Sequence, residues 1–147
     1  MFDELVVGIG INVEKEALFS PDERVELVGR TTAHLPNIRV MKFSGLAVHF
    51  VRQLGARVMV RGVRPLTDIA SEFTMMLANR ELDPEIETVF LMADQRFAHV
   101  SSSLIKQIAP LATDEMLERF VPPSLVGPLR DRLSRASRVG QGGASDV

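Results

Sequence analysis

Residues 5–11 read Leu-Val-Val-Gly-Ile-Gly-Ile, a continuous apolar run close to the start of the chain. Such a run is typical of a parallel strand that is covered on both faces. A helix start follows, because Ser20, Pro21 and Glu23 stand at the N-cap, N1 and N3 positions of a capping box. The run and the helix, which Pro36 is expected to end, predict a βα unit.

The same alternation of strand and helix continues along the chain. The further expected strands are residues 38–43, 57–60 and 88–92, and the expected helices are residues 46–54, 66–80, 101–111 and a region from Thr113 that is broken at Pro122-Pro123. Strands and helices at this spacing predict an α/β fold, a Rossmann-like parallel sheet with helices on both faces.

One helix carries a marked apolar face. Within residues 66–80, Ile69, Phe73, Met76 and Leu77 recur at helical spacing, which predicts a face packed against the core. For Met75 and Met76 two interpretations stay open, a core position or a contact between subunits.

Composition places the chain among globular proteins of a single domain. It has 147 residues and a mass of 16.3 kDa, 46% of its residues are hydrophobic, and it contains no cysteine. The lack of cysteine excludes a disulfide scaffold, a thiolate zinc site and a cysteine nucleophile. We expect a folded domain over residues 1–135 and a disordered tail over 136–147, where no periodic core face is found.

Charge and hydropathy limit the partners. The formal net charge is −2, so the chain is not expected to coat a nucleic-acid backbone. No apolar run reaches the ~18 residues of a membrane span. We therefore expect a soluble, cytoplasmic protein with a small-molecule ligand and without a nucleic-acid or membrane partner.

Polar groups cluster where the expected strands end, and ligands of open α/β sheets bind beyond those ends. The residues at these strand ends, apolar ones included, are Asn12 and Lys15, Ser44-Gly45-Leu46, the Arg-Gly-Val-Arg sequence of residues 61–64, and Phe97 with Ser101-Ser102-Ser103. Cations, glycines and a helix start in these places suit a phosphorylated ligand.

Arg61 and Arg64 are the sharpest of these features, because they flank Gly62 at the end of an apolar strand. Two arginines beside a glycine suit a phosphate that approaches the backbone closely. A pair of surface arginines at a strand end is the alternative. The serines at residues 101–103 have two interpretations as well, an N-cap with spare hydroxyls or an anion site at a helix N-terminus.

Other charged residues carry less information. Lys15 lies between two glutamates and has the pattern of an ordinary loop lysine. Glu72, one helical turn past Asp68, either faces solvent or pairs with Arg64. The histidines have no metal-ligand spacing and are expected to be ordinary helix or loop residues: His34, His49 and His99.

Several motifs, in order and at matching spacing, resemble the phosphopantetheine adenylyltransferase family over residues 2–133. They are Phe-Asp at 2–3, Lys15 before the Phe-Ser-Pro-Asp-Glu-Arg of 19–24, Phe-Ser-Gly-Leu at 43–46, Arg-Gly-Val-Arg at 61–64 with Asp68 and Glu72, Glu-Thr-Val-Phe-Leu-Met at 87–92, and Val-Ser-Ser-Ser-Leu-Ile-Lys at 100–106. The resemblance implies a nucleotidyltransferase fold.

It also implies an activity. In that family the phosphate of 4′-phosphopantetheine attacks the α-phosphate of ATP, with Mg²⁺ assisting, and yields dephospho-coenzyme A and pyrophosphate in coenzyme A biosynthesis. No covalent enzyme intermediate forms, so catalysis rests on positioning and on stabilisation of phosphate charge. The family forms homohexamers, which is the oligomeric state that the resemblance implies.

Residue roles follow from the same resemblance. Lys15, Ala47 and Arg61 would hold phosphopantetheine. The ATP-binding residues would be Gly62, Val63, Arg64, Glu72, Phe97, Ala98, His99, Val100, Ser101, Ser102 and Ser103. Among these groups, Arg64 and Lys15 would support the reaction.

The chain departs from the family pattern at its start. The family begins with a strand and a glycine-containing loop that carries Thr/His-x-Gly-His, and the second histidine of that motif contacts the ATP phosphates. No residue here matches it, so the catalytic histidine is not identified, and a βα unit of roughly 25 residues would be required to supply it. We expect this polypeptide to lack a central strand, to be poorly stable and to be nearly inactive, and we expect a version with that unit to be active.

Two other interpretations stay open at this stage. One is a nucleotidyltransferase of the same superfamily that acts on a nicotinamide or glycerol phosphate. The other is a non-catalytic or fragmentary nucleotide-binding protein, which the missing histidine motif favours.

Overall fold

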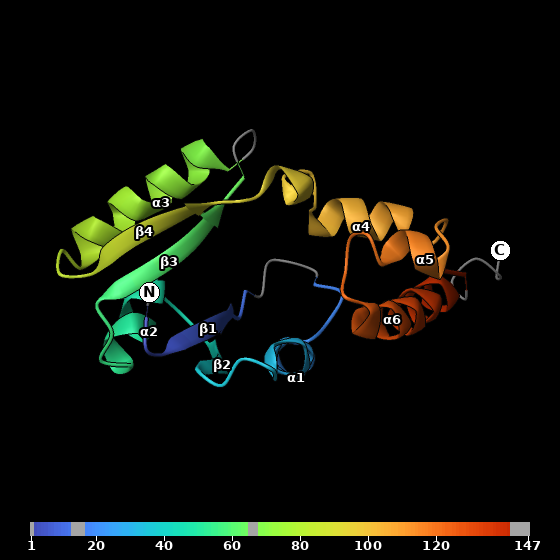
Figure 1. Ribbon diagram of the computed structural model, residues 1–147, viewed down its shortest axis with the longest axis horizontal. Coiled ribbons are helices and arrows are strands. Elements are labelled where there is room, and N and C mark those ends of the chain that lie inside the picture. Colours follow the sequence, from blue (N-terminus) through green and yellow to red (C-terminus); the bar gives the residue numbers. More distant parts are fainter. Residues whose placement is uncertain (1, 13–16, 65–67, 142–147) are drawn as a thin grey trace, which may run out of the picture. The chain divides into compact units, whose positions relative to one another are not determined.

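The structure of the chain is a computed structural model, and it describes residues 2–12, 17–64 and 68–141 (Figure 1). Strands and helices alternate as the sequence predicts. In chain order they are β1 (Leu5–Gly10), α1 (Pro21–Thr32), β2 (Ile38–Phe43), α2 (Ala47–Gln53), β3 (Val58–Val63), α3 (Ile69–Leu82), β4 (Glu87–Met92), the 3-10 turn η1 (Gln95–Phe97), α4 (Ser102–Ile108), α5 (Asp114–Leu117) and α6 (Pro123–Gln141). The predicted α/β class is confirmed.

The described strands pair as two sheets of two strands, β1 with β2 and β3 with β4. The β3–β4 pair is parallel, with a register that runs from Val58↔Glu87 to Val63↔Met92. In the other pair, the amide of Leu5 donates to Asn37 and the amide of Ile11 donates to Phe43, both at 2.9 Å. The same residue offset at both ends is that of parallel strands.

Parallel pairing is thus confirmed. The described residues form two separate sheets and not the one continuous sheet that was expected. Among them, no strand pairs with members of both sheets. The expected lack of a central strand does not conflict with this pairing and stays a prediction.

The chain divides into two units, each of which has its own hydrophobic cluster. The first unit comprises Met1–Ile9, Val13–Lys42 and Val100–Val147, and the second comprises Gly10–Asn12 and Phe43–His99. In the first unit, the buried cluster is formed by Ala109, Leu117, Val126 and Leu129. In the second unit, it is formed by Val48, Val51 and Ile86.

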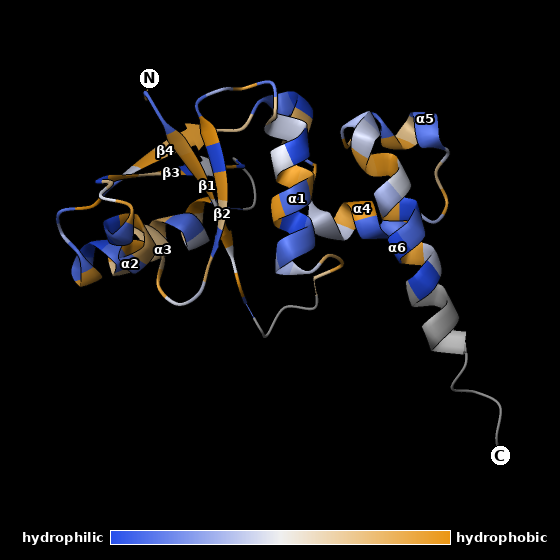
Figure 2. Cartoon of the chain, turned by 90° about the horizontal axis from the view of Figure 1, so that it is seen from below, coloured by the Kyte–Doolittle hydropathy of each residue, from blue (hydrophilic) through white to orange (hydrophobic). Residues whose placement is uncertain are grey.

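Helix α1 begins as the sequence predicts. The amide of Glu23 donates to the Ser20 hydroxyl at 3.2 Å, and the Glu23 carboxylate accepts from the Ser20 amide at 2.7 Å. Within the first unit, Arg132 of α6 contacts this end of α1, because it donates to the Leu18 carbonyl and to Glu23, each at 2.6 Å. In Figure 2, α1 shows hydrophilic and hydrophobic residues in alternation, whereas β1 is mainly hydrophobic.

Helix α3 corrects one prediction. It lies along β3 and β4 in the second unit (Figure 1), and Phe73 stacks with Phe90 at 6.5 Å between ring centroids. Nevertheless Ile69, Phe73 and Leu77 are each about half exposed, and the buried residue of α3 is Asn79. The expected core face is therefore largely uncovered, because the two strands beneath α3 are too few to cover an apolar stripe of this length.

Two further points concern the chain's later part. Helix α6 continues to Gln141, so the stretch expected to be a tail from residue 136 begins within a helix, while residues 142–147 lie outside the described part. The division at residue 135 stays a prediction. No helix in the described residues has both the length and the apolar character needed to cross a membrane.

The buried cluster of the first unit generates a prediction. Leu117→Ala is expected to lower the free energy of unfolding by about 2–5 kcal/mol, because its fully buried side chain would leave a cavity. Leu111 is 89% exposed, so Leu111→Ala is the matched control and should change this free energy by less than about 0.5 kcal/mol. Urea unfolding monitored by circular dichroism measures both. Equal losses would contradict the assigned cluster.

Candidate functional site

The Arg-Gly-Val-Arg segment lies farther inside the sheet than the sequence suggests. We expected the strand to end at residue 60, but β3 continues through Val63, and only Arg64 follows it. The reason is the parallel ladder, which pairs Arg61 with Phe90 and Gly62 with Leu91 and continues as the Ala93 amide donates to the Val63 carbonyl at 2.9 Å. The arginines therefore stand on and just beyond a hydrogen-bonded strand.

Gly62 does not have the special conformation that its position suggested. Its φ angle is not positive, and a Cβ atom added to it would meet no atom within 4 Å. Neither a turn nor a packing contact in the described structure requires glycine here. Val63 is 3% exposed, so its side chain belongs to the interior and only its backbone is suited to meet a ligand.

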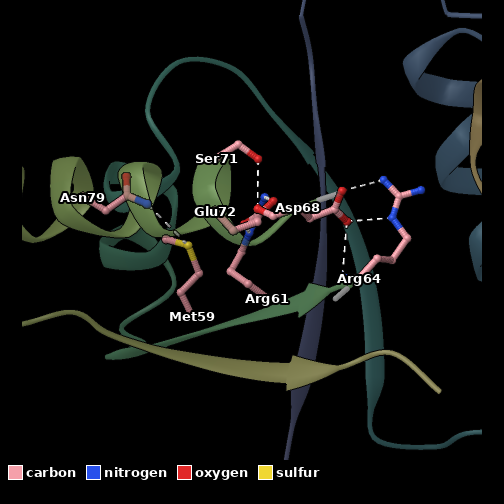
Figure 3. Close-up of polar contacts among 7 residues, drawn as sticks. All are labelled: Met59, Arg61, Arg64, Asp68, Ser71, Glu72 and Asn79. Carbon is pink, nitrogen blue, oxygen red and sulfur yellow. Dashed lines mark hydrogen bonds and ion pairs between the residues drawn. The ribbon is translucent and has the colours of Figure 1, made fainter. Parts of the chain in front are cut away.

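Arg61 is held by Glu72. Its Nε and Nη2 atoms donate to the two carboxylate oxygens of Glu72, each at 2.7 Å (Figure 3). These hydrogen bonds raise the pKa of the Arg61 guanidinium above its ordinary value, against a smaller opposing effect of burial. Glu72 is thus a partner, but of Arg61; pairing with Arg64 and a solvent-facing position, the two interpretations left open, are both wrong.

Arg64 is held by Asp68 in the same manner. Its Nε and Nη2 atoms donate to the carboxylate oxygens of Asp68 at 2.6 and 2.7 Å, and its backbone amide donates to Oδ2 at 3.3 Å (Figure 3). Hydrogen bonding to Asp68 is also the main cause that raises the pKa of Arg64. Sequence reasoning gave Asp68 no role, although its position four residues after an arginine was a signal for an ion pair.

The two pairs form one arrangement. Asp68 and Glu72 lie one helical turn apart at the start of α3, and each fixes a guanidinium through its Nε–Nη2 edge. Bidentate pairs are directional as well as strong, so they orient the remaining N–H groups. For Arg61, no described residue accepts from Nη1, which leaves that donor for an anionic ligand.

Ala47 and residues 97–99 also belong to the second unit. Ala47 is the first residue of α2. Two residues before it stands Gly45, whose φ of 79° favours glycine. Phe97 ends the turn η1 with its side chain 52% exposed, and the Arg96 guanidinium lies 5.5 Å from its ring centroid. Ala98 and His99 follow directly. An exposed ring in this place can stack on a planar ligand.

Residues 100–103 belong to the first unit. Ser101 is the N-cap of α4, and its hydroxyl accepts from the Leu104 amide at 3.1 Å, so the N-cap interpretation is confirmed. Ser102 and Ser103 are exposed in the first turn. Val100 is partly buried ahead of them. The anion-binding role of this helix start stays a prediction.

The predicted site residues are therefore only partly brought together. Arg61, Arg64 and Glu72 share one cluster in the second unit, whereas the serines lie in the first unit. The meeting of the arginines with the serines stays a prediction, and Lys15 lies outside the described residues. Within the described ranges, no group of three or more His, Cys, Asp or Glu side chains is placed to hold a metal ion.

Comparison with known proteins gives a consistent result. Residues 1–108 match the family model described as cytidylyltransferase-like. The chain is 65% identical over 138 residues to phosphopantetheine adenylyltransferase of Rhodopirellula baltica, covering 93% of this chain and 77% of that protein. It is 44% identical over 138 residues to the enzyme of that name from Caulobacter vibrioides, with 92% and 83% covered. It is also 39% identical over 126 residues to the phosphopantetheine adenylyltransferase of Clostridium botulinum, covering 86% of this chain and 78% of that protein.

The serines generate a prediction about stability. Ser101→Ala is expected to lower the free energy of unfolding by about 1 kcal/mol, since it removes the hydroxyl that caps α4. Ser103→Ala is the matched control within the same helix start, and it should change the free energy by less than about 0.5 kcal/mol. Denaturant unfolding of both variants measures the difference. A larger loss for Ser103→Ala would show that the cap is assigned to the wrong serine.

Proposed function

The chain belongs to the phosphopantetheine adenylyltransferase family, and we propose that it transfers the adenylyl group of ATP to 4′-phosphopantetheine, with dephospho-coenzyme A and pyrophosphate as products. The observation that carries this proposal is the pair of oriented arginines at the end of β3, in a chain whose similarity to these enzymes extends over nearly its whole length. The reaction is a step of coenzyme A biosynthesis.

The proposed chemistry is a direct displacement. A phosphate oxygen of 4′-phosphopantetheine forms a bond to the α-phosphorus of ATP, and the bond from that phosphorus to the bridging oxygen of the β-phosphate breaks. Pyrophosphate leaves with the electron pair of that bond. The protein's part is to align the two substrates and to stabilise the charge on the phosphate oxygens. Guanidinium donors held in a fixed orientation suit this task.

Each substrate takes its own set of residues in this proposal. Phosphopantetheine is held by Lys15, Ala47 and Arg61. ATP is held by Gly62, Val63, Arg64, Glu72 and residues 97–103, with Arg64 and the serines at the triphosphate and Phe97 near the nucleotide. The ion pair between Arg61 and Glu72 supports a close arrangement of the two sets, because it joins a residue of one set to a residue of the other.

Magnesium enters the proposal as part of the substrate. The described residues do not fit a resident Mg²⁺ ion, because they contain no group of three metal-ligating side chains and because Asp68 and Glu72 are both occupied by arginines. Mg²⁺ in nucleotide enzymes commonly keeps most of its waters and is bound through the substrate phosphates. We propose MgATP as the nucleotide substrate.

We also propose a homohexamer that acts in the cytoplasm. Several large apolar side chains of α3 are about half exposed, which supports their burial in a contact between subunits: Ile69, Phe73, Met75 and Leu77. The cytoplasmic location rests on the family to which the chain belongs and on the requirement for ATP.

A pair of arginine substitutions tests the function. Arg61→Met with Arg64→Met is expected to lower kcat/KM by about 10²–10³-fold, because both oriented charges are lost from the phosphate site. Arg52→Met is the matched control, since Arg52 also pairs with carboxylates, those of Asp83 and Glu85, but lies outside the proposed site. Pyrophosphate release in the full-length gene product measures all three proteins.

Substrate comparison completes this test. Turnover with ATP and 4′-phosphopantetheine but not with nicotinamide mononucleotide would support the proposed substrate. Unchanged turnover in the double variant would refute the proposed role of the arginines. If ATP raised the unfolding temperature and the wild type released no pyrophosphate, the non-catalytic nucleotide-binding protein would be the better description.

Removal of magnesium gives a separate prediction. Excess EDTA is expected to stop pyrophosphate release, whereas the unfolding temperature of the nucleotide-free protein should change by less than about 1 °C, because only ligands of the folded protein stabilise it. Addition of Mg²⁺ beyond the EDTA concentration should restore turnover. A fall in the unfolding temperature of the nucleotide-free protein would indicate a resident metal instead.

A further inference from the structure

Asp68 occupies the N-cap position of α3, but its carboxylate does not cap the helix. Other polar N-cap residues of the described chain do accept a backbone amide with their side chains: Ser20 from Glu23, Asp94 from Arg96, Ser101 from Leu104 and Thr113 from Met116. The four residues that do cap have ψ angles between 140° and 166°, whereas Asp68 has a ψ of −19°, in the helical region. With this backbone conformation its carboxylate is not placed to accept the first amides of α3, and it contacts Arg64 instead.

The carboxylate is used to hold Arg64 at the end of β3. Both of its oxygens accept from the guanidinium, Oδ2 also lies 3.3 Å from the Arg64 amide, and the Asp68 amide donates to the Arg64 carbonyl at 3.2 Å. Asp68 thus contacts both the backbone and the side chain of Arg64 (Figure 3). The side chains of Arg64 and Asp68 are 31% and 20% exposed, which allows a ligand to reach a guanidinium that is already oriented.

Orientation matters for a long side chain. A free arginine samples many rotamers and loses that freedom when it binds a phosphate, whereas an arginine held by a carboxylate has already lost it. Small displacements of a positioning group are costly to a reaction that depends on alignment. A carboxylate on the Nε–Nη2 edge therefore improves transition-state contacts even though it offsets part of the positive charge.

We propose that Asp68 is a positioning residue for adenylyl transfer, which holds the Arg64 guanidinium in the orientation that meets the nucleotide phosphates. The inference rests on the proposed function and adds to it a residue that does not itself touch the substrate. A purely structural role is the alternative, in which the ion pair only joins β3 to α3.

The same helix offers a matched control for that alternative. At the C-terminal end of α3, Asp83 accepts from Nε and Nη2 of Arg52 at 2.5 and 2.7 Å, which is the same bidentate geometry. Asp83 lies outside the proposed site, and its pKa is lowered chiefly by hydrogen bonding to Arg52. A substitution that removes the Arg52–Asp83 pair therefore measures how much the loss of a purely structural ion pair lowers kcat/KM.

Two substitutions separate positioning from stability. Asp68→Ser removes the carboxylate and with it the ion pair to Arg64, so the unfolding temperature should fall by about as much as in Asp83→Asn. Its kcat/KM for ATP should in addition fall by about 10–100-fold. Asp83→Asn should leave kcat/KM for ATP within about twofold of the wild type while it lowers the unfolding temperature. Pyrophosphate release with ATP varied, in the full-length gene product, measures both.

A double substitution tests the route through Arg64. In an Arg64→Met background, Asp68→Ser should cause no further loss of kcat/KM, because the guanidinium that it positions is absent. Additive losses would overturn the proposal, and so would an Asp68→Ser variant with the kinetics of the wild type. Both of those outcomes leave the proposed function intact. A wild-type protein that releases no pyrophosphate would refute the proposed function, and the inference with it.

Discussion

The parallel pairing of β3 with β4 is the constraint on which the candidate site depends. The ladder runs as far as Val63↔Met92 and so fixes Arg64 as the first residue beyond the strand. A helix that connects two parallel strands must begin near the carboxyl end of the first. This requirement places the first turn of α3, with Asp68 and Glu72, beside the two arginines. The contacts of the cluster are thus a consequence of the βαβ connection as well as of the residue types.

The ion pairs also determine what kind of electrostatics the site can supply. Two guanidinium groups are matched by two carboxylates, so the cluster of Arg61, Arg64, Asp68 and Glu72 has little net charge. The whole chain carries a net charge of only −2. Long-range attraction of ATP by this cluster is therefore weak. In the proposed function its contribution is the direction of donors at short range, which suits a direct displacement between two bound substrates.

Local patterns predicted local structure well, and tertiary partners much less well. The capping box at Ser20 and the cap at Ser101 depend on residues three positions apart, and both are found as predicted. The end of β3 was misplaced because arginine and glycine resemble strand terminators, whereas pairing with β4 extends the strand over them. Glu72 was given the wrong partner, because Arg61 is eleven residues away and only the fold brings them together. The exposed face of α3 has the same origin, since periodicity specifies an apolar face but not what covers it.

Asp68 shows how a local and a tertiary requirement compete for one side chain. As a cap it would stabilise α3 by about 1 kcal/mol, a contribution that any short polar residue could make. As a partner of Arg64 it makes charge-assisted hydrogen bonds that a serine or threonine cannot reproduce. The helical backbone conformation of Asp68, with φ of −107° and ψ of −19°, goes with the second use of the carboxylate and not with the first. Among the polar N-cap residues of the described chain, Asp68, the one next to the proposed nucleotide site, is the one whose side chain accepts no amide of its helix.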